Sequence, residues 1–288
     1  MNSEVTLYIP TYNSAKYLPE VIPAVMAQTY PIVEVIIVDG SSTDNSIEII
    51  EEFAKNSTYP IRLIMQAPKK GLADARNIAF KNCHTKYLAS ADADVVLSPD
   101  WLENIMHAFN RHDNIAGVCG TLKERYTDTK ADFWRSTHLK QSWGKGEFTN
   151  IPFVFGSNNL YVCKDVLDAG LFDSSLIFAG EDYDISVKLK KNQKQLLYTD
   201  RAKCEHLRRD SIKSILNTIW RYNYFGGKLQ AKGFFRHILS PAVNAVFVVK
   251  LIFKDIKIFN MNNFILDITC FPYLTYMDFK KYLVRFLK

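Results

Sequence analysis

Two aspartates one residue apart, Asp92 and Asp94, follow directly after the apolar run Tyr87–Ala91. Side chains alternate along a strand, so residues two apart point to the same side. At the carboxyl end of a strand this spacing aims two carboxylates at one point, and such hard oxygen ligands suit Mg²⁺ or Mn²⁺. An isolated Asp-x-Asp is more often a solvated turn. The pair therefore indicates a metal site only if the rest of the chain supports one.

The chain around this pair alternates strand-like and helix-like segments. Strands are expected at residues 5–9, 33–38, 61–65 and 87–91, and helices at residues 15–28, 44–54 and 71–82. Such repetition is typical of a parallel sheet with right-handed crossovers, and ligands bind such sheets beyond the carboxyl ends of the strands. Three polar segments lie there, namely Pro10–Asn13, Asp39–Asp44 and Asp92–Asp94. We therefore expect them to converge on one rim of the sheet.

Each rim segment also has a purely structural interpretation. Residues 11–13 could simply cap the following helix, and residues 39–44 could simply form a turn. Lys69 and Arg76 are suitable counter-charges for a diphosphate, although exposed lysines are more often merely solvated. A structural account of each segment alone does not explain why all of these loops are polar at once.

Five motifs occur together over roughly residues 4–210. They are Ile9-Pro-Thr-Tyr-Asn13, Val38-Asp-Gly-Ser-Ser-Thr-Asp-Asn-Ser46, Gly71-Leu-Ala-Asp-Ala-Arg-Asn77, Asp92-Ala-Asp94 and Gly180-Glu-Asp182. In this order they resemble the family 2 glycosyltransferases, which are inverting enzymes with a GT-A fold. The resemblance implies an α/β, Rossmann-like sheet of mainly parallel strands flanked by helices. It also implies metal-dependent transfer of a sugar from a nucleotide diphosphate to an acceptor hydroxyl.

The resemblance assigns roles at the metal. Asp94 would ligate a divalent ion, Mn²⁺ or Mg²⁺, that bridges the two phosphates, while Asp92 would lie against the ribose and the metal waters. The ion would act as a Lewis acid on the departing phosphate. His206 matches a position where the family often supplies a further metal or diphosphate contact, although a lone histidine is more often structural.

The resemblance also assigns the donor-binding residues. Asp39 would accept a hydrogen bond from the base, and its geometry favours UDP over GDP, while Tyr12 would pack on the base. Pro10, Thr11, Asn13 and Ala93 complete the donor-binding segments. Many relatives have two acids before the Gly-Ser, whereas here Gly40 occupies the second position, so the identity of the base stays open.

Asp182 would be the general base that takes the proton of the acceptor hydroxyl. Glu181 is expected on the sugar and acceptor side of the site. The alternative is that Glu181 and Asp182 merely favour the positive end of the helix that they begin. A single base with no second carboxylate nucleophile implies inversion at the anomeric carbon. Three residues between the strand-like segments Ile151–Phe155 and Leu160–Cys163 resemble the loop that lines the sugar pocket, namely Gly156, Asn158 and Asn159.

The charged segment Lys123–Asn150 carries two tryptophans, Trp134 and Trp143. Aromatic faces suit sugars, so we expect this segment to form a lid on the acceptor side. Tryptophans are, however, more often packing residues.

Charge divides the chain into two regions. Residues 1–210 carry 24 Lys+Arg against 27 Asp+Glu, a net of −3, whereas residues 211–288 carry 12 against 3, a net of +9. We expect a GT-A catalytic domain at residues 1–210 and a basic, amphipathic helical appendage at residues 211–288, with one helix over residues 211–224.

A second carboxyl-terminal helix is expected to carry an apolar face opposite a lysine face. The apolar face comprises Val248, Val249, Ile252, Phe253 and Ile256, and the lysine face comprises Lys250, Lys254 and Lys257. This pattern predicts attachment to an anionic membrane surface, or alternatively packing on the body. The uncharged run at residues 238–249 is shorter than the roughly 20 residues needed to cross a bilayer.

The five cysteines are scattered and include no Cys-x-x-Cys pair, which indicates neither a disulfide framework nor a zinc site. A first strand at Val5 leaves no room for a signal peptide. We expect a cytoplasmic protein on the inner face of a membrane, with a glycan or lipid-linked acceptor and no nucleic-acid partner. Two alternatives are a sugar-1-phosphate nucleotidyltransferase, disfavoured because no Gly-rich phosphate loop is present near the amino terminus, and a non-catalytic nucleotide-sugar-binding module.

Overall fold

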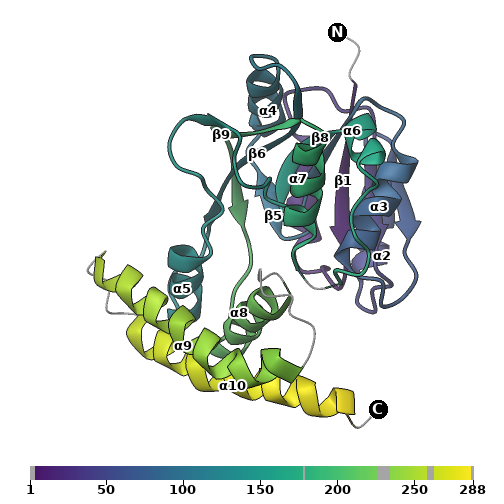
Figure 1. Cartoon of the computed structure of the whole chain (residues 1–288). Helices are drawn as coiled ribbons and strands as arrows, with labels where there is room; N and C mark the ends of the chain where they lie inside the picture. Colours follow the sequence, from purple (N-terminus) through teal and green to yellow (C-terminus); the bar gives the residue numbers. More distant parts are fainter. Residues whose placement is uncertain (1–3, 178, 226–233, 258–262, 287–288) are drawn as a thin grey trace. The chain divides into compact units, whose positions relative to one another are not determined.

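A computed structural model describes residues 4–177, 179–225, 234–257 and 263–286 and divides the chain into two compact units (Figure 1). Unit 1 combines the chain up to Arg125 with Gln141–Leu207. Unit 2 combines Tyr126–Lys140 with the chain from Arg208 onward. The grouping of residues 126–140 with the carboxyl-terminal helices was not apparent from the sequence, where this segment is only charged and aromatic.

The described strands of unit 1 form one nine-stranded sheet. They are β1 (Val5–Thr11), β2 (Val35–Asp39), β3 (Ile61–Met65), β4 (Tyr87–Ala91), β5 (Val95–Leu97), β6 (Ile115–Glu124), β7 (Glu147–Thr149), β8 (Asn158–Val162) and β9 (Gln195–His206). Their order is β3-β2-β1-β4-β8-β6-β9-β5, and β7 pairs with β9. The first four strands are parallel, β8 runs antiparallel to β4 and β6, and β6 pairs with β9 in parallel. The predicted Rossmann-like α/β sheet is confirmed.

Two hydrophobic clusters cover the two faces of this sheet. One cluster takes in α1 (Leu18–Met26), α2 (Ser46–Asn56) and α4 (Trp101–Phe109). The other takes in α3 (Leu72–Asn82), α6 (Cys163–Asp168) and α7 (Glu181–Lys191). Strand residues alternate between them, since Leu7 and Ile9 belong to the first cluster and Tyr8 to the second. Burial on both faces explains why the strands read as continuous apolar runs.

The predicted strand at Ile151–Phe155 is wrong. These residues form a loop, and the neighbouring strand β7 lies earlier, at Glu147–Thr149. Val154 and Phe155 are apolar because they are buried in a cluster that also includes α7. The backbone N–H of Val154 donates to Ser186 Oγ of α7 at 3.1 Å, so a side chain takes the place of a strand partner.

Unit 2 contains four described helices, namely α5 (Lys130–His138), α8 (Ile212–Phe225), α9 (Phe234–Lys257) and α10 (Phe264–Phe286). Its core gathers Trp134 with Ile215, Ile219, Leu251 and Leu274. The predicted helix over residues 211–224 matches α8 closely.

Helix α9 divides its apolar residues between the core and the surface, which the predicted single apolar face did not anticipate. Val248 is buried in the core, whereas Val249, Phe253 and Ile256 are 48%, 60% and 50% exposed. Because residues three or four apart share one side of a helix, the exposed Lys250 and Lys257 flank Phe253 and do not oppose it. Within the described residues, we find no helix whose length and apolar content would let it cross a bilayer.

Candidate active site

The carboxyl ends of three neighbouring strands meet at one rim of unit 1. Thr11 at the end of β1 pairs in register with Asp39 at the end of β2, and β4 ends at Ala91, directly before Asp92. Strand β1 has β2 and then β3 on one side and β4 on the other, so the order of the strands reverses next to β1. Such a switch point opens a crevice for ligands in α/β sheets. The loops after β1, β2 and β4 therefore gather as the sequence predicted.

The loops after β1 and β2 interlock. Asp39 is buried, and its Oδ1 and Oδ2 accept hydrogen bonds from the N–H and the Oγ–H of Ser42 at 2.7 and 2.6 Å. Asn13 Oδ1 accepts from Thr43 N at 2.8 Å, and Asn13 N donates to Ser42 Oγ at 2.8 Å. Asp39 thus holds the turn together, and each oxygen of its carboxylate can accept a further hydrogen bond. Tyr12 is 63% exposed, as an aromatic that packs on a ligand must be before the ligand binds.

Arg76 of α3 lies beneath the rim and is almost completely buried. Its Nη1 donates to Tyr8 Oη at 3.0 Å and to the carbonyl of Gly156 at 2.8 Å. Its Nη2 lies 3.6 Å from both Asp92 Oδ1 and Glu181 Oε1. The structure therefore pairs Arg76 with carboxylates of the site itself, whereas the sequence suggested a diphosphate contact. Lys69 remains exposed in the turn before α3.

Gly156 allows this arrangement. A Cβ at position 156 would lie 2.7 Å from Arg76 Nη2 and 3.6 Å from Asp182 Cβ. Any other residue would therefore displace the guanidinium or the loop. Glycine is required here for the close approach of backbone to side chain.

Asp92 is an acid that the protein does not fully neutralise. Its side chain is 29% exposed, and among the described residues its buried Oδ1 accepts no hydrogen bond. Burial raises its pKa to about 7, and Asp94 and Glu181 add to the rise while Arg76 opposes it. A carboxylate in such surroundings gains from a nearby cation.

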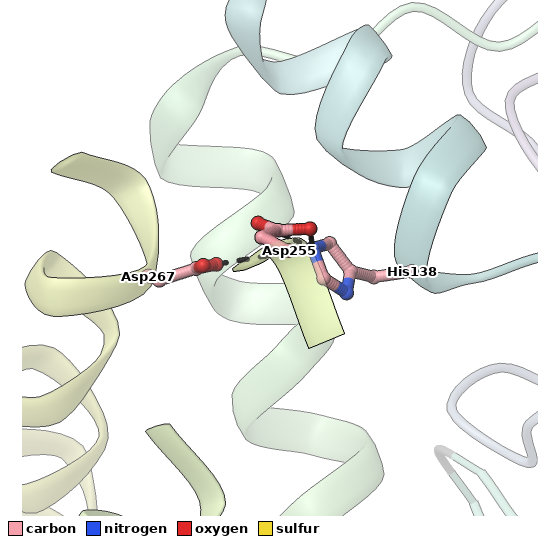
Figure 2. A group of neighbouring side chains, drawn as sticks. All are labelled: His138, Asp255 and Asp267. Atoms are coloured by element: carbon pink, nitrogen blue, oxygen red, sulfur yellow. Dashed lines mark hydrogen bonds and ion pairs between the residues drawn. The ribbon is translucent and has the colours of Figure 1, made fainter. Parts of the chain in front are cut away.

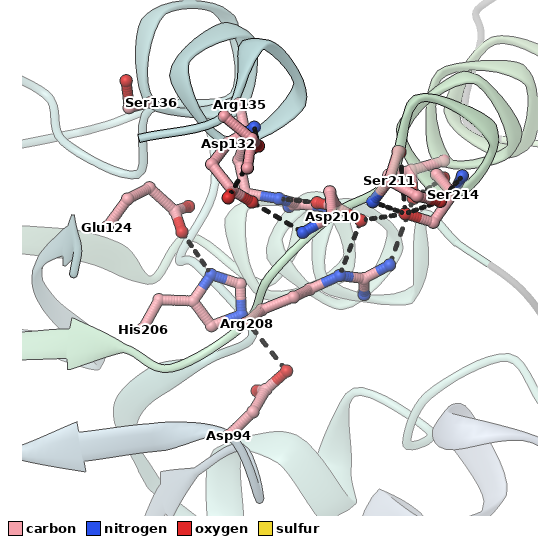
Figure 3. Close-up of polar contacts among 12 residues, drawn as sticks. Asp94, Glu124, Asp132, Arg135, Ser136, His206, Arg208, Asp210, Ser211 and Ser214 are labelled. Atoms are coloured by element: carbon pink, nitrogen blue, oxygen red, sulfur yellow. Dashed lines mark hydrogen bonds and ion pairs between the residues drawn. The ribbon is translucent and has the colours of Figure 1, made fainter. Parts of the chain in front are cut away.

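Asp94 lies beside His206, with Asp94 Oδ2 and His206 Nε2 3.2 Å apart (Figure 3). On its other side, His206 Nδ1 lies 2.8 Å from Glu124 Oε2. Burial alone would lower the pKa of His206, but hydrogen bonds to Asp94 and Glu124 raise it to about 9. Strand register explains the group, since His206 in β9 pairs with Glu124 in β6 and with Val95 in β5, next to Asp94.

These residues fit a divalent cation. Two ligands of one ion at about 2.1 Å lie roughly 3 Å apart, as Asp94 and His206 do. Glu124 would orient the imidazole through the other ring nitrogen, an arrangement common behind metal-bound histidines. Asp92 Oδ1 is a further buried oxygen of the rim, 3.6 Å from Arg76 Nη2. Glu124 was not predicted from the sequence, because only the pairing of β6 with β9 brings it to His206.

The second pair of acids begins α7. Gly180 precedes it with a left-handed φ of 95°, and Asp182 Oδ1 accepts from Tyr183 N at 2.8 Å. Burial raises the pKa of Asp182 to about 6, the neighbouring Glu181 adds to the rise, and Arg76 opposes it. Glu181 is buried and its Oε1 lies 3.6 Å from Arg76 Nη2, whereas the raised pKa of Asp182 suits a group that exchanges a proton near neutral pH.

Asn158 and Asn159 support the loop that contains Gly156. Both are buried. Asn158 Oδ1 accepts from Gly120 N at 2.9 Å, and Asn159 Nδ2 donates to the carbonyls of Phe155 and Gly156 at 2.8 and 3.0 Å. In the structure these side chains therefore brace the backbone of the loop.

The two tryptophans fall in different units. Trp143 is half-buried in unit 1, where it stacks on Phe155 with ring centroids 5.2 Å apart. Trp134 is buried in the core of unit 2, and its Nε1 donates to Asp267 Oδ1 at 2.7 Å. Its ring therefore has no open face for a sugar, and the structure does not support the predicted acceptor-side role of Trp134.

The sequence model described as "Glycosyl transferase family 2" matches residues 6–167, which is more than half of the chain. The chain belongs to this family. A second model, "Glycosyl transferase family group 2", matches residues 88–279. The matches span the Asp-x-Asp, Asp182 and His206, and they favour a transferase over the two alternatives drawn from the sequence.

Curated relatives carry the names of glycosyltransferases and of polysaccharide synthases. The chain is 24% identical over 267 residues to dolichyl N-acetyl-alpha-D-glucosaminyl phosphate 3-beta-D-2,3-diacetamido-2,3-dideoxy-beta-D-glucuronosyltransferase of Methanococcus voltae, covering 88% of this chain and 83% of that protein. It is 25% identical to poly-beta-1,6-N-acetyl-D-glucosamine synthase of Staphylococcus epidermidis, covering 83% of this chain but only 58% of the relative. It spans only 37% of the glycosyltransferase GlyG of Streptococcus pneumoniae.

Solved structures share the fold. Residues 1–349 of S. aureus TarS in complex with UDP-GlcNAc align with a TM-score of 0.62 at 17% identity, covering 85% of this chain and 81% of that one. The mannosyltransferase PcManGT from Pyrobaculum calidifontis, in complex with GDP-Man and Mn²⁺, aligns with a TM-score of 0.61 at 19% identity, covering 80% and 65%. At these identities the likeness concerns the fold.

Proposed function

We propose that this family 2 glycosyltransferase is metal-dependent and inverting, and that it moves a sugar from a UDP-linked donor to a hydroxyl of a glycan or lipid-linked acceptor. The observation that carries this proposal is the rim of unit 1. There Asp94 and His206 lie 3.2 Å apart, as two ligands of one cation do, and Asp182 lies beside Gly156, whose carbonyl accepts a hydrogen bond from Arg76.

Each rim residue has a distinct task in this mechanism. Asp94, His206 and Asp92 would hold the ion, which would neutralise charge on the leaving diphosphate. Asp39 and Tyr12 hold the base from the loops after β2 and β1.

Asp182 removes the proton from the acceptor hydroxyl as that hydroxyl attacks the anomeric carbon. In this mechanism Glu181 stays paired with Arg76, Asp182 alone transfers the proton, and no carboxylate acts as a nucleophile. One displacement without a covalent intermediate inverts the anomeric centre.

The proposal is tested by thermal unfolding of the full chain with UDP-GlcNAc, UDP-Glc, GDP-Man and no donor, each with and without Mn²⁺. A donor at 100-fold its dissociation constant should raise the unfolding midpoint by roughly 5–10 °C, and only with Mn²⁺. Asp94→Ala should abolish the shift. Asp128→Ala, which removes an exposed acid of unit 2, should keep it. A wild-type chain that no nucleotide sugar stabilises would contradict the proposed function.

We also propose that unit 2 attaches the enzyme to the inner, anionic face of a membrane, where a lipid-linked acceptor would lie. Exposed large apolar side chains line its two long helices. They are Leu239, Val243, Val246, Val249, Phe253 and Ile256 on α9, and Phe264, Ile265, Ile268, Phe271, Tyr276 and Phe279 on α10. Exposed lysines, including Lys250 and Lys257, accompany them. Apolar contact combined with positive charge is the mode by which amphipathic helices bind anionic lipid.

Co-sedimentation with phosphatidylglycerol vesicles tests this attachment. Lys250→Glu/Lys257→Glu should weaken binding by roughly tenfold or more at low salt, since each basic residue near an anionic surface contributes about 1 kcal/mol. Lys55→Glu/Lys191→Glu makes the same charge change on exposed positions of unit 1 and should have a smaller effect. Phe253→Ser should remove part of the binding that survives high salt. A wild-type chain that ignores vesicles at low salt would overturn the attachment and leave the donor proposal intact.

A further inference from the structure

A cluster of buried titratable side chains lies in unit 2, and the mechanism does not use it. His138 at the end of α5, Asp255 of α9 and Asp267 of α10 point toward one another (Figure 2). Their side chains are at most 3% exposed. His138 Nε2 lies 3.0 Å from Asp255 Oδ1 and 4.0 Å from Asp267 Oδ1. One ligand atom from each residue fits within 4.8 Å of the other two.

The cluster carries an excess of acid. Two carboxyl groups contact each other there (Figure 2), and burial raises the pKa of Asp267 to about 7, with Asp255 adding to the rise. Burial lowers the pKa of His138, and the nearby Lys254 and Lys140 lower it further, while Asp255 opposes the shift. One imidazole thus stands against two carboxyl groups. A buried pair of acids in contact needs a shared cation, which is either a proton or a metal ion.

Acceptor oxygens around the cluster lack donors among the described residues. Asp267 Oδ2 and Asn263 Oδ1 are buried and accept no hydrogen bond from that part of the chain. Asn263 is only 1% exposed, and its amide Nδ2 lies 3.3 Å from His138 Nε2, so its amide group reaches the cluster. Buried oxygens of this kind are usually satisfied by a hydrogen bond or by an ion.

The spacing of the groups matches the ligands of an ion. Ligands at about 2.1 Å from a tetrahedral centre lie roughly 3.4 Å apart, and the separations from His138 Nε2 to the two carboxylates, 3.0 and 4.0 Å, bracket this value. One imidazole and two or three oxygens form a donor set suited to divalent first-row metals. The three helices α5, α9 and α10 each contribute a ligand, so an ion would tie them together.

We propose that His138, Asp255 and Asp267 form a structural site for a divalent first-row transition metal, separate from the donor-site cation, with Asn263 available as a fourth ligand. Metal bound only by the folded state stabilises it by mass action. The site would fasten α5 to the carboxyl-terminal helices. Residues 126–140 belong to unit 2 although their sequence neighbours on both sides belong to unit 1.

Co²⁺ titration of the full chain tests the site. The Asp94→Ala/His206→Ala background removes two of the three cation ligands proposed in unit 1. We expect one equivalent of Co²⁺ to bind, with visible absorption bands of an ion of low coordination number. Trp134 fluorescence should be quenched, since its ring centroid lies 4.6 Å from that of His138. The unfolding midpoint should rise by roughly 5–10 °C at 100-fold the dissociation constant.

Asp267→Asn in the same background keeps the shape of the side chain and should weaken Co²⁺ binding at least ~100-fold. Asp128→Asn, an exposed acid of unit 2, should not. Equal Co²⁺ binding with and without Asp267→Asn would overturn the site. If the Asp267→Asn variant does not fold, Co²⁺ binding to its parent, the Asp94→Ala/His206→Ala variant, decides the test alone. A folded parent that shows neither Co²⁺ uptake nor quenching of Trp134 would show that the two acids share only a proton.

Discussion

Each unit buries an arginine among carboxylates, and the two clusters behave in opposite ways. In unit 2, Arg135 Nε donates directly to Asp210, whose backbone N–H is held by Asp132 at 2.6 Å and whose Oδ1 accepts from Ser214 Oγ at 2.6 Å (Figure 3). Burial alone would raise the pKa of Asp210, but the hydrogen bond and charge of Arg135 lower it below its ordinary value. In unit 1, Arg76 stands 3.6 Å from its two acids, and the pKa of Asp92 rises to about 7.

The difference distinguishes a structural cluster from a site. Arg135 satisfies its carboxylate directly, so the charge is stabilised within the protein. Arg76 faces Asp92, Glu181 and Asp182 together and cannot neutralise them all. Carboxylates at the end of a sheet can bind a cation or a proton from solution when the protein does not fully neutralise their charge. The direction of the pKa shift therefore separates the two roles, although both arginines are buried.

The strongest test of this comparison is Asp182→Asn, which preserves shape but cannot accept a proton. Turnover should fall by on the order of 10²–10⁴ while donor binding is retained. Asp184→Asn on the same helix removes an acid that pairs with Lys188 at 2.7 Å and should change turnover little. Steady-state kinetics with an accepted donor would measure both. Near-normal turnover of Asp182→Asn would remove Asp182 from the role of base.

In unit 2 the largest effect should come from Arg135→Leu. The change removes the more buried of the two arginines that contact Asp210, since Arg208 Nε still lies 3.3 Å from Asp210 Oδ1, and should lower the free energy of unfolding by about 3 kcal/mol. Arg209→Leu breaks an exposed ion pair with Asp128 and should cost less than about 1 kcal/mol. Urea denaturation monitored by helical circular dichroism would compare the two. Equal losses would mean that the Arg135 cluster is not the structural element inferred from its pKa direction.

The pKa of Asp182, raised to about 6, predicts how activity depends on pH. A general base must be ionised, so turnover should rise with pH through about 6 and level off near 7. Below pH 6 it should fall about tenfold per unit. Turnover measured from pH 5 to 8 at saturating donor and Mn²⁺ would show this. A profile without an ascending limb in this window would contradict the assignment.

Asp92→Asn should stabilise the donor-free chain while damaging donor binding. The folded pKa of Asp92 is raised to about 7, so this carboxyl group lowers stability progressively as the pH rises from about 4 to about 7, and the penalty is absent where it is protonated in both states. The variant should therefore gain about 1 kcal/mol at pH 8 and little at pH 4. Urea denaturation at the two pH values would show the difference. A loss of stability at pH 8 would mean that Asp92 is held as favourably as Asp210.

The local features of this protein were predictable from its sequence. The strands at Ile61–Met65 and Tyr87–Ala91, the helices that follow the early strands and the polar rim loops depend on periodicity and on turn residues close in the chain. Five short motifs resemble those of family 2 glycosyltransferases and predicted the family, and the match to the family model confirms that prediction. The strand predicted at Ile151–Phe155 failed because an apolar run shows burial but does not show what covers it.

Only the tertiary structure decided which distant side chains meet. Glu124 and His206 are 82 residues apart and come together through the pairing of β6 with β9. Arg76 turns from a presumed diphosphate ligand into the counter-ion of two acids because α3 packs beneath the rim. Trp134 and His138 were expected in a lid over the acceptor but lie in unit 2, where Trp134 is part of the core and His138 contacts Asp255 and Asp267. Strand register and helix packing are cooperative properties of the whole chain, so no local pattern of residues reports them.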